Sequence, residues 1–275
     1  MNIVLQDHAK VLAEELLQDH PVFPEYTDHL TILVVGSIGA GFSDEFSDVD
    51  FWFLCADKYV DEIREKFHKV GLRFDELPPE LISSGSIEAH YFTFPISKFQ
   101  QGLQIGDDQC MFFGAFGLVI HDPSQQFAAL RSQCINIPEE LVHNKVGVAY
   151  SRVIQCSFEI RKRIKRFQPL CWIQYSHDIM KWALELCCWL DRKPPIYSSW
   201  LFKQAQSCST VSIIMPAIEQ VMRAIGPAIE KGLTDNDCGS SLMEAVEALE
   251  SAVGKAVQIA GFGDVPRWSP EDMHG

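Results

Sequence analysis

The sequence predicts an α/β (α+β) fold in which a small domain with a mixed sheet is followed by an all-helical bundle. The first observation behind this prediction is that strand and helix patterns alternate from the N-terminus to about residue 136. The second is that strand patterns are absent over 137–260, where apolar residues recur at helical spacing. The chain has 275 residues, of which 47% are hydrophobic, and this is enough for two modest domains with their own cores. We therefore expect domains at 1–136 and 137–260, followed by a loosely held tail at 261–275.

The elements of the first domain are predicted from apolar spacing and from turn residues. Asp57 is expected to cap a helix that ends at Gly71, and Asp122 followed by Pro123 is typical of a helix start. β-branched and aromatic residues predict the later strands. In order, we expect a helix over 2–18, strands over 31–35 and 47–55, a helix over 57–70, a short strand over 72–74, strands over 87–94 and 117–120, and a helix over 122–134.

The second domain is expected to consist of helices only. Pro138 can open a long helix, and Pro194 with Pro195 follows the end of the next one. The expected helices cover 138–167, 170–190, 197–207, 211–231 and 241–259.

Composition excludes several classes of protein. The net charge of −14 argues against a nucleic-acid partner, because binding a polyanion normally needs a basic surface. Nine cysteines without a Cys-x-x-Cys pair, and no secretory signal, favour a reducing compartment, so we expect a cytoplasmic protein. The longest apolar run, 111–120, is too short to span a bilayer, and we expect no membrane partner. No helix shows a clear surplus apolar face, so the sequence leaves the oligomeric state open.

One stretch carries the chemistry. Gly36-Ser37 closes the first predicted strand, and Asp48-Val49-Asp50 opens the second. Side chains alternate along a strand, so Asp48 and Asp50 point to the same face. Two adjacent carboxylates repel each other unless a cation lies between them, and Mg²⁺ is the obvious oxygen-binding candidate. The glycine–serine turn offers backbone N–H groups to an anion, so the unit reads as a phosphate cradle beside a metal-binding carboxylate pair.

Two better-known glycine-rich loops are excluded. The order from Gly36 to Gly41 is Gly-x-x-Gly-x-Gly, and a second strand rather than a long helix follows, which a dinucleotide-binding unit would not allow. No Gly-Lys-Ser or Gly-Lys-Thr is present, so the loop is not a P-loop.

The pattern resembles the signature of the DNA polymerase β-like nucleotidyltransferase superfamily, in which Gly-Ser is followed, after a spacer, by Asp-x-Asp. Chain length and domain order are similar to those of the bacterial aminoglycoside and lincosamide nucleotidyltransferases, the small-molecule branch. The stretch 87–96 is similar to the strand that carries the third carboxylate in such enzymes, which would here be Glu88. The resemblance implies a nucleotidyltransferase domain over 1–136 and a helical bundle domain over 137–260.

The resemblance also implies an activity. It is a Mg²⁺-dependent transfer of a nucleoside monophosphate, AMP from ATP in the expected case, to a hydroxyl of a small molecule, with release of pyrophosphate. An aminoglycoside-like antibiotic is one acceptor class. Asp48, Asp50 and Glu88 would be the catalytic and metal-binding residues, with one or two Mg²⁺ ions as cofactor and Glu88 alternatively a general base. Gly36 and Ser37 would bind the phosphates of the nucleoside triphosphate. The alternatives are a non-catalytic nucleotide sensor or partner-binding protein on the same fold, and an enzyme that nucleotidylates proteins.

Some polar residues are given structural roles instead. His90 shares a predicted strand face with Glu88, but a structural histidine is the favoured interpretation. Asp75 is a fallback third carboxylate. The basic run 161–166 is interpreted as a solvated helix surface.

Overall fold

A computed structural model describes residues 2–76, 79–84, 87–232 and 239–265. The chain divides into two compact units, Met1–Asn136 and Ile137–Gly275, and each is described here by itself. The first contains a five-stranded mixed sheet and the second is helical, which confirms the predicted α+β fold class. None of the helices in the described part of the chain is long and apolar enough to cross a membrane.

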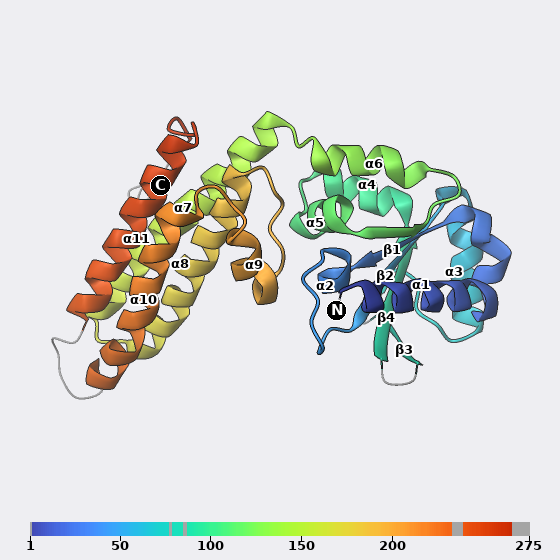
Figure 1. Cartoon of the computed structure of the whole chain (residues 1–275), viewed down its shortest axis with the longest axis horizontal. Coiled ribbons are helices and arrows are strands. Elements are labelled where there is room, and N and C mark those ends of the chain that lie inside the picture. The colour runs from blue at the N-terminus through green and yellow to red at the C-terminus, as the bar shows by residue number, and fades with distance from the viewer. Residues whose placement is uncertain (1, 77–78, 85–86, 233–238, 266–275) are drawn as a thin grey trace. The chain divides into compact units, whose positions relative to one another are not determined.

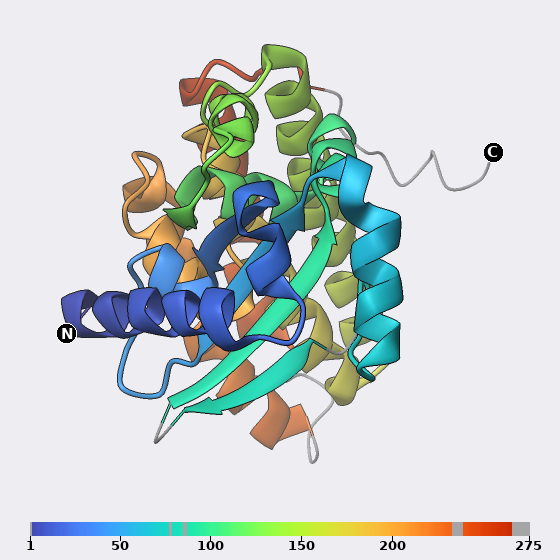
Figure 2. The ribbon, with the colours of Figure 1, turned by 90° about the vertical axis from the view of Figure 1, so that its right-hand side faces the viewer.

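The first unit is built around one sheet with the strand order β3-β4-β2-β1-β5 (Figures 1 and 2). β2 and β4 run parallel, and the other neighbouring pairs are antiparallel. The strands are β1 (Leu30–Val35), β2 (Val49–Cys55), β3 (Glu80–Ser84), β4 (Ile87–Pro95) and β5 (Leu118–His121). The helices are α1 (Asn2–Asp19), η1 (Phe23–His29), α2 (Gly36–Gly39), η2 (Asp57–Tyr59), α3 (Val60–Lys69), α4 (Ile96–Gln104), α5 (Asp108–Phe116) and α6 (Gln126–Ile135).

Helices cover both faces of this sheet, and the alternation along β2 shows which residues face which side. Phe51 and Phe53 belong to a buried cluster with residues of α1, η1 and α3. Trp52, between them, packs edge-on against Phe99 of α4 and Phe113 of α5, at ring-centroid distances of 6.0 and 4.7 Å. Asp50 lies two residues before Trp52 and therefore points to the same side of the sheet as α4 and α5.

Several predicted details of this unit are wrong. The stretch 72–74 is not a strand, and β3 and the helices α4 and α5 were not expected. Asp57 does not cap α3; it lies in η2, and its carboxylate accepts a hydrogen bond from the N–H of Ser97. Asp122 is not the N-cap of α6, which begins at Gln126, although its carboxylate accepts the N–H of Phe127.

The second unit is dominated by four long helices, in which α7 packs against α8 and α11, and α10 packs against α8 and α11 (Figure 1). Its helices are α7 (Glu139–Lys165), α8 (Pro169–Leu190), α9 (Ser198–Ala205), α10 (Val211–Gly232) and α11 (Ser240–Ile259). Within the predicted tail, Phe262 and Val265 are buried beyond α11. The rest of that tail lies outside the described residues.

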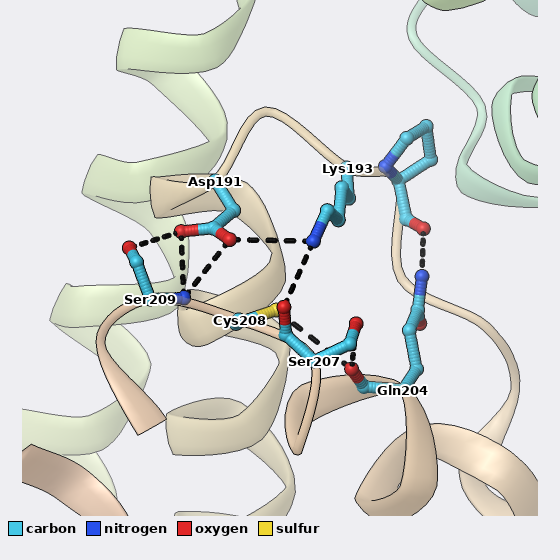
Figure 3. A network of polar contacts seen from close by, with 7 residues as sticks. Asp191, Lys193, Gln204, Ser207, Cys208 and Ser209 are labelled. Atoms are coloured by element: carbon cyan, nitrogen blue, oxygen red, sulfur yellow. Dashed lines mark hydrogen bonds and ion pairs between the residues drawn. The ribbon is translucent and has the colours of Figure 1, made fainter. Parts of the chain in front are cut away.

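Polar contacts secure the connection between α8 and α10 (Figure 3). Asp191 accepts hydrogen bonds from the N–H and the hydroxyl of Ser209, and it forms an ion pair with Lys193. The Gln204 amide donates to the Pro194 carbonyl, and its oxygen accepts the N–H of Ile196. These contacts tie the segments before and after α9 together.

The basic run near the end of α7 is largely neutralised rather than only solvated. Arg161 pairs with Glu250 of α11, and Arg163 pairs with Glu159 one turn away. Lys165 and Arg166 are exposed, as predicted for a solvated helix end.

Candidate metal centre

The two aspartates of the motif lie at the start of β2. Asp50 is the second residue of the strand, and Asp48 lies just before it. On one side Asp50 is paired with Val35, the last residue of β1, and on the other with His90 of β4. The main chain of three adjacent strands therefore places the motif, and the two carboxylates share the face predicted from the sequence.

Gly36 follows β1 directly and contacts Asp50. Its φ is +65°, a backbone conformation that residues other than glycine rarely adopt. A Cβ at this position would lie 2.6 Å from Oδ2 of Asp50. The absence of a side chain at Gly36 thus leaves the space that the Asp50 carboxylate occupies.

The backbone after Gly36 forms a short helical turn, α2, where the sequence predicted only a polar connection. The carbonyl of Ser37 accepts hydrogen bonds from the N–H groups of Phe42 and Ser43, at 2.8 and 3.1 Å, and this closes the turn. The Ser37 side chain is buried. Its predicted role in binding phosphate stays a prediction.

His90 joins the two aspartates, although the sequence favoured a structural role for it. Its Nδ1 lies 3.5 Å from Oδ2 of Asp48 and 4.0 Å from Oδ1 of Asp50. One ligand atom from each of the three residues lies within 4.8 Å of the others. The signal available in the sequence was the shared face of 88 and 90, but the pairing of His90 with Asp50 needs the register of two parallel strands that are distant in sequence.

Glu88, the predicted third carboxylate, lies on the other side of the imidazole. Its Oε1 is 3.4 Å from Nε2 of His90, and its side chain is 65% exposed. It does not belong to the group formed by Asp48, Asp50 and His90. Asp75, the fallback, forms an ion pair with Lys98 instead.

Electrostatics of the cluster favour binding of a cation. Burial, together with the negative charge of Asp48, raises the pKa of Asp50 to about 6, and the positive charge available on His90 acts in the opposite direction. The cluster also lies in a unit with a net negative charge, since residues 1–136 contain 21 aspartates and glutamates but eight lysines and arginines. A bound cation would relieve the repulsion between the two aspartates.

The spacing of the three donors suits a divalent ion. Atoms that bind one octahedral ion at about 2.1 Å lie about 3.0 Å apart when adjacent and about 4.2 Å apart when opposite. The separations of His90 Nδ1 from Oδ2 of Asp48 and Oδ1 of Asp50, 3.5 and 4.0 Å, lie between these two values. The donor types suit a divalent ion, and the side chains would shift to bind one.

A similar fold occurs in a solved structure. The nucleotidyltransferase-like protein from Exiguobacterium sibiricum 255-15 aligns with 91% of this chain and 77% of its own, at a TM-score of 0.52 and 12% sequence identity. Residues 105–201 match a family model described as a domain of unknown function, DUF4037. That stretch begins directly after α4 and ends within α9, so it does not include Gly36, Asp48 or Asp50. No curated protein matches the chain in sequence. The chain therefore has a nucleotidyltransferase-like fold, and an Asp-Asp-His cluster in that fold is a possible metal site.

Proposed function

We propose that this protein is a divalent-metal-dependent nucleotidyltransferase that moves a nucleoside monophosphate, AMP from ATP, to a hydroxyl of a small molecule. The observation that carries the proposal is the cluster of Asp48, Asp50 and His90 beside Gly36, in a fold similar to that of a nucleotidyltransferase-like protein. Gly36, Asp48 and Asp50 follow one another in the order of the superfamily signature which the sequence resembles.

The roles of the residues follow from their positions. A bound divalent cation, Mg²⁺ in the sequence-based expectation, supplies charge neutralisation for the triphosphate and its leaving pyrophosphate. Asp48 and Asp50 hold that cation, and Gly36 lets the Asp50 carboxylate approach the backbone. The backbone at Gly36 and Ser37 is proposed to contact the phosphates. A carboxylate of the site accepts the proton of the acceptor hydroxyl.

The acidity of the first unit supports a cationic acceptor. A surplus of 13 acidic side chains over residues 1–136 attracts positively charged molecules and repels nucleic acid. An aminoglycoside-like acceptor fits this charge, and fold alone does not choose between acceptors.

The test is a screen with the full-length protein. Each of the four α-³²P-labelled ribonucleoside triphosphates is offered with a panel of hydroxylated acceptors that includes aminoglycosides, at constant metal concentration. We expect labelled acceptor and one equivalent of pyrophosphate, and loss of at least about 100-fold in rate for Asp50→Asn. Asp7→Asn is the matched control, because Asp7 is an exposed aspartate of α1 and should leave the rate unchanged.

Other outcomes identify the alternatives. Triphosphate binding without pyrophosphate release across the panel would replace the proposed transferase with a nucleotide sensor. Label transferred to protein would indicate protein nucleotidylation. Full activity of Asp50→Asn would refute the assignment of the metal site.

A further inference from the structure

The donor set of the cluster differs from an all-carboxylate magnesium site. Two carboxylate oxygens come from Asp48 and Asp50, and the third donor atom is an imidazole nitrogen of His90. The position is fixed by main-chain pairing, because His90 lies directly opposite Asp50 in the parallel β2–β4 ladder. The third donor is therefore part of the sheet.

The surroundings of His90 provide a second, independent observation. Nδ1 faces the two aspartates, whereas Nε2 faces Oε1 of Glu88 at 3.4 Å. Histidines that bind metals nearly always donate the N–H of their other ring nitrogen to a carboxylate, a carbonyl or water, which fixes the tautomer and the ring orientation. Glu88 occupies the place of that outer carboxylate.

We propose that His90 is the third metal ligand of this site, that Glu88 orients it from outside, and that the site consequently prefers a first-row transition ion such as Mn²⁺ to Mg²⁺. The inference concerns the metal centre on which the proposed function rests. Mg²⁺ is a hard ion that favours oxygen donors, and a nitrogen donor shifts a mixed site toward transition ions. Glu88 is thus a positioning residue and not a ligand.

A rival arrangement has the same geometry without a metal. A protonated His90 could neutralise the two aspartates as an imidazolium, with both ring N–H groups pointing at carboxylates. In the metal-bound arrangement, Nδ1 donates its lone pair to the metal. In the rival arrangement, Nδ1 carries a proton that it donates to Asp48. A measurement of nitrogen coordination separates them.

The experiment uses the full-length protein with Mn²⁺ alone and without nucleotide. Electron spin-echo envelope modulation of bound Mn²⁺ is expected to show coupling to a ¹⁴N nucleus in the wild type, and this coupling should vanish in His90→Asp. His68→Gln is the matched control, because His68 is an exposed histidine of α3 in the same unit, and the coupling should persist there.

Calorimetric competition between Mn²⁺ and Mg²⁺ gives the second readout. The wild type should bind Mn²⁺ at least about 10-fold more tightly than Mg²⁺, and His90→Asp should reduce that ratio to near one. Glu88→Gln should weaken Mn²⁺ binding by about 10-fold to 100-fold while it keeps the nitrogen coupling. If His90→Asp does not fold, His90→Gln replaces it, since a neutral amide adds no charge.

Bound Mn²⁺ without nitrogen coupling in the wild type would overturn the inference, as would an unchanged Mn²⁺/Mg²⁺ ratio in His90→Asp. The absence of any Mn²⁺ binding would overturn it as well. The outcomes for the metal site and for the proposed function are distinguishable. Nitrogen-coordinated Mn²⁺ in a protein that transfers no nucleotide would support the metal assignment and refute the transferase. Mg²⁺-supported nucleotide transfer without nitrogen coupling would support the transferase and refute the metal assignment.

Discussion

Replacing Gly36 by alanine tests whether the backbone beside Asp50 shapes the metal centre. The new Cβ would lie 2.6 Å from Oδ2 of Asp50, and real Cβ contacts shorter than 3.0 Å essentially do not occur. The carboxylate must therefore move by at least 0.4 Å. The position of the Asp50 carboxylate relative to Asp48 and His90 would change, and metal binding should weaken because it depends on ligand distances.

Gly71 offers a matched control for the backbone. Its φ is +75°, close to the +65° of Gly36, but a Cβ at Gly71 would meet nothing within 4 Å. Alanine at either position should cost about 1–2 kcal/mol in the free energy of unfolding, because both place a side chain in the left-handed region. The carboxylate of Asp50 is the end of a rotatable side chain, so its displacement adds little to the stability loss.

The two variants should separate in metal binding. Denaturant unfolding in metal-free buffer is expected to show similar losses of stability for Gly36→Ala and Gly71→Ala. Calorimetric titration with Mn²⁺ should show at least about 10-fold weaker binding for Gly36→Ala and unchanged binding for Gly71→Ala. Wild-type metal affinity in a folded Gly36→Ala protein, or an equal loss in both variants, would refute the reasoning.

Three further predictions concern stability. Burial lowers the pKa of His20 from 6.5 to about 4, so between these values His20 binds more protons in the unfolded chain than in the folded protein. Relative to His20→Gln, the wild type should therefore lose about 3 kcal/mol of unfolding free energy as the pH falls from 7 to 4. Denaturation curves for both proteins at each pH check this, and equal pH slopes would contradict it. In α10, Gly226→Ala should raise stability by about 0.5–1 kcal/mol, since a Cβ there meets nothing within 4 Å. Gly114→Ala should instead lower it by about 1–3 kcal/mol, because its Cβ would lie 2.2 Å from Sγ of the buried Cys134. Thermal melts of both variants decide the signs, and a stabilised Gly114→Ala would show that the core there is loosely packed.

The sequence predicts elements well where one face of an element is apolar and the other polar. The long helices of the second unit have such patterns, whereas β1, β2 and β4 are recognised by their β-branched and aromatic residues. Each of these elements is observed within a few residues of its predicted range. The helix α5 was missed because Met111, Phe112, Phe113 and Gly114 are all buried, so the segment shows no polar face from which a helical period could be detected.

Local capping rules failed for a different reason. Asp57 and Asp122 have the residue type and position of an N-cap, but both carboxylates bind groups that are distant or displaced in the chain. Asp57 accepts from Ser97, 40 residues away, and Asp122 accepts from Thr31, 91 residues away. Tertiary contacts of this kind override a local preference of about 1 kcal/mol, and one sequence does not reveal them.

About half of the residues of the candidate site could be predicted from the sequence. Gly36, Asp48 and Asp50 were found because their chemistry is contained in one continuous stretch, with its alternation and its glycine. The position of His90 depends on the parallel pairing of β2 with β4, and the sequence between these strands does not specify that register. The resemblance of the strand 87–96 therefore favoured its carboxylate, Glu88, although the sheet brings the imidazole to the aspartates.

Under the proposed function, the first unit separates the residues that would bind the metal from the loop that precedes them. Gly36, Asp50 and His90 lie at or beside three adjacent strands, whose main-chain hydrogen bonds hold the donors before any ligand arrives. The loop before β2 is different: a turn closed by Asp44 and Ser47 carries Phe46, whose side chain is 87% exposed. Substitutions in that loop leave the strand pairing intact, whereas a change of register at β4 would remove the imidazole from the cluster. In the proposed transferase, the metal site would therefore depend on the sheet, whereas recognition of the acceptor could vary in the loops around it.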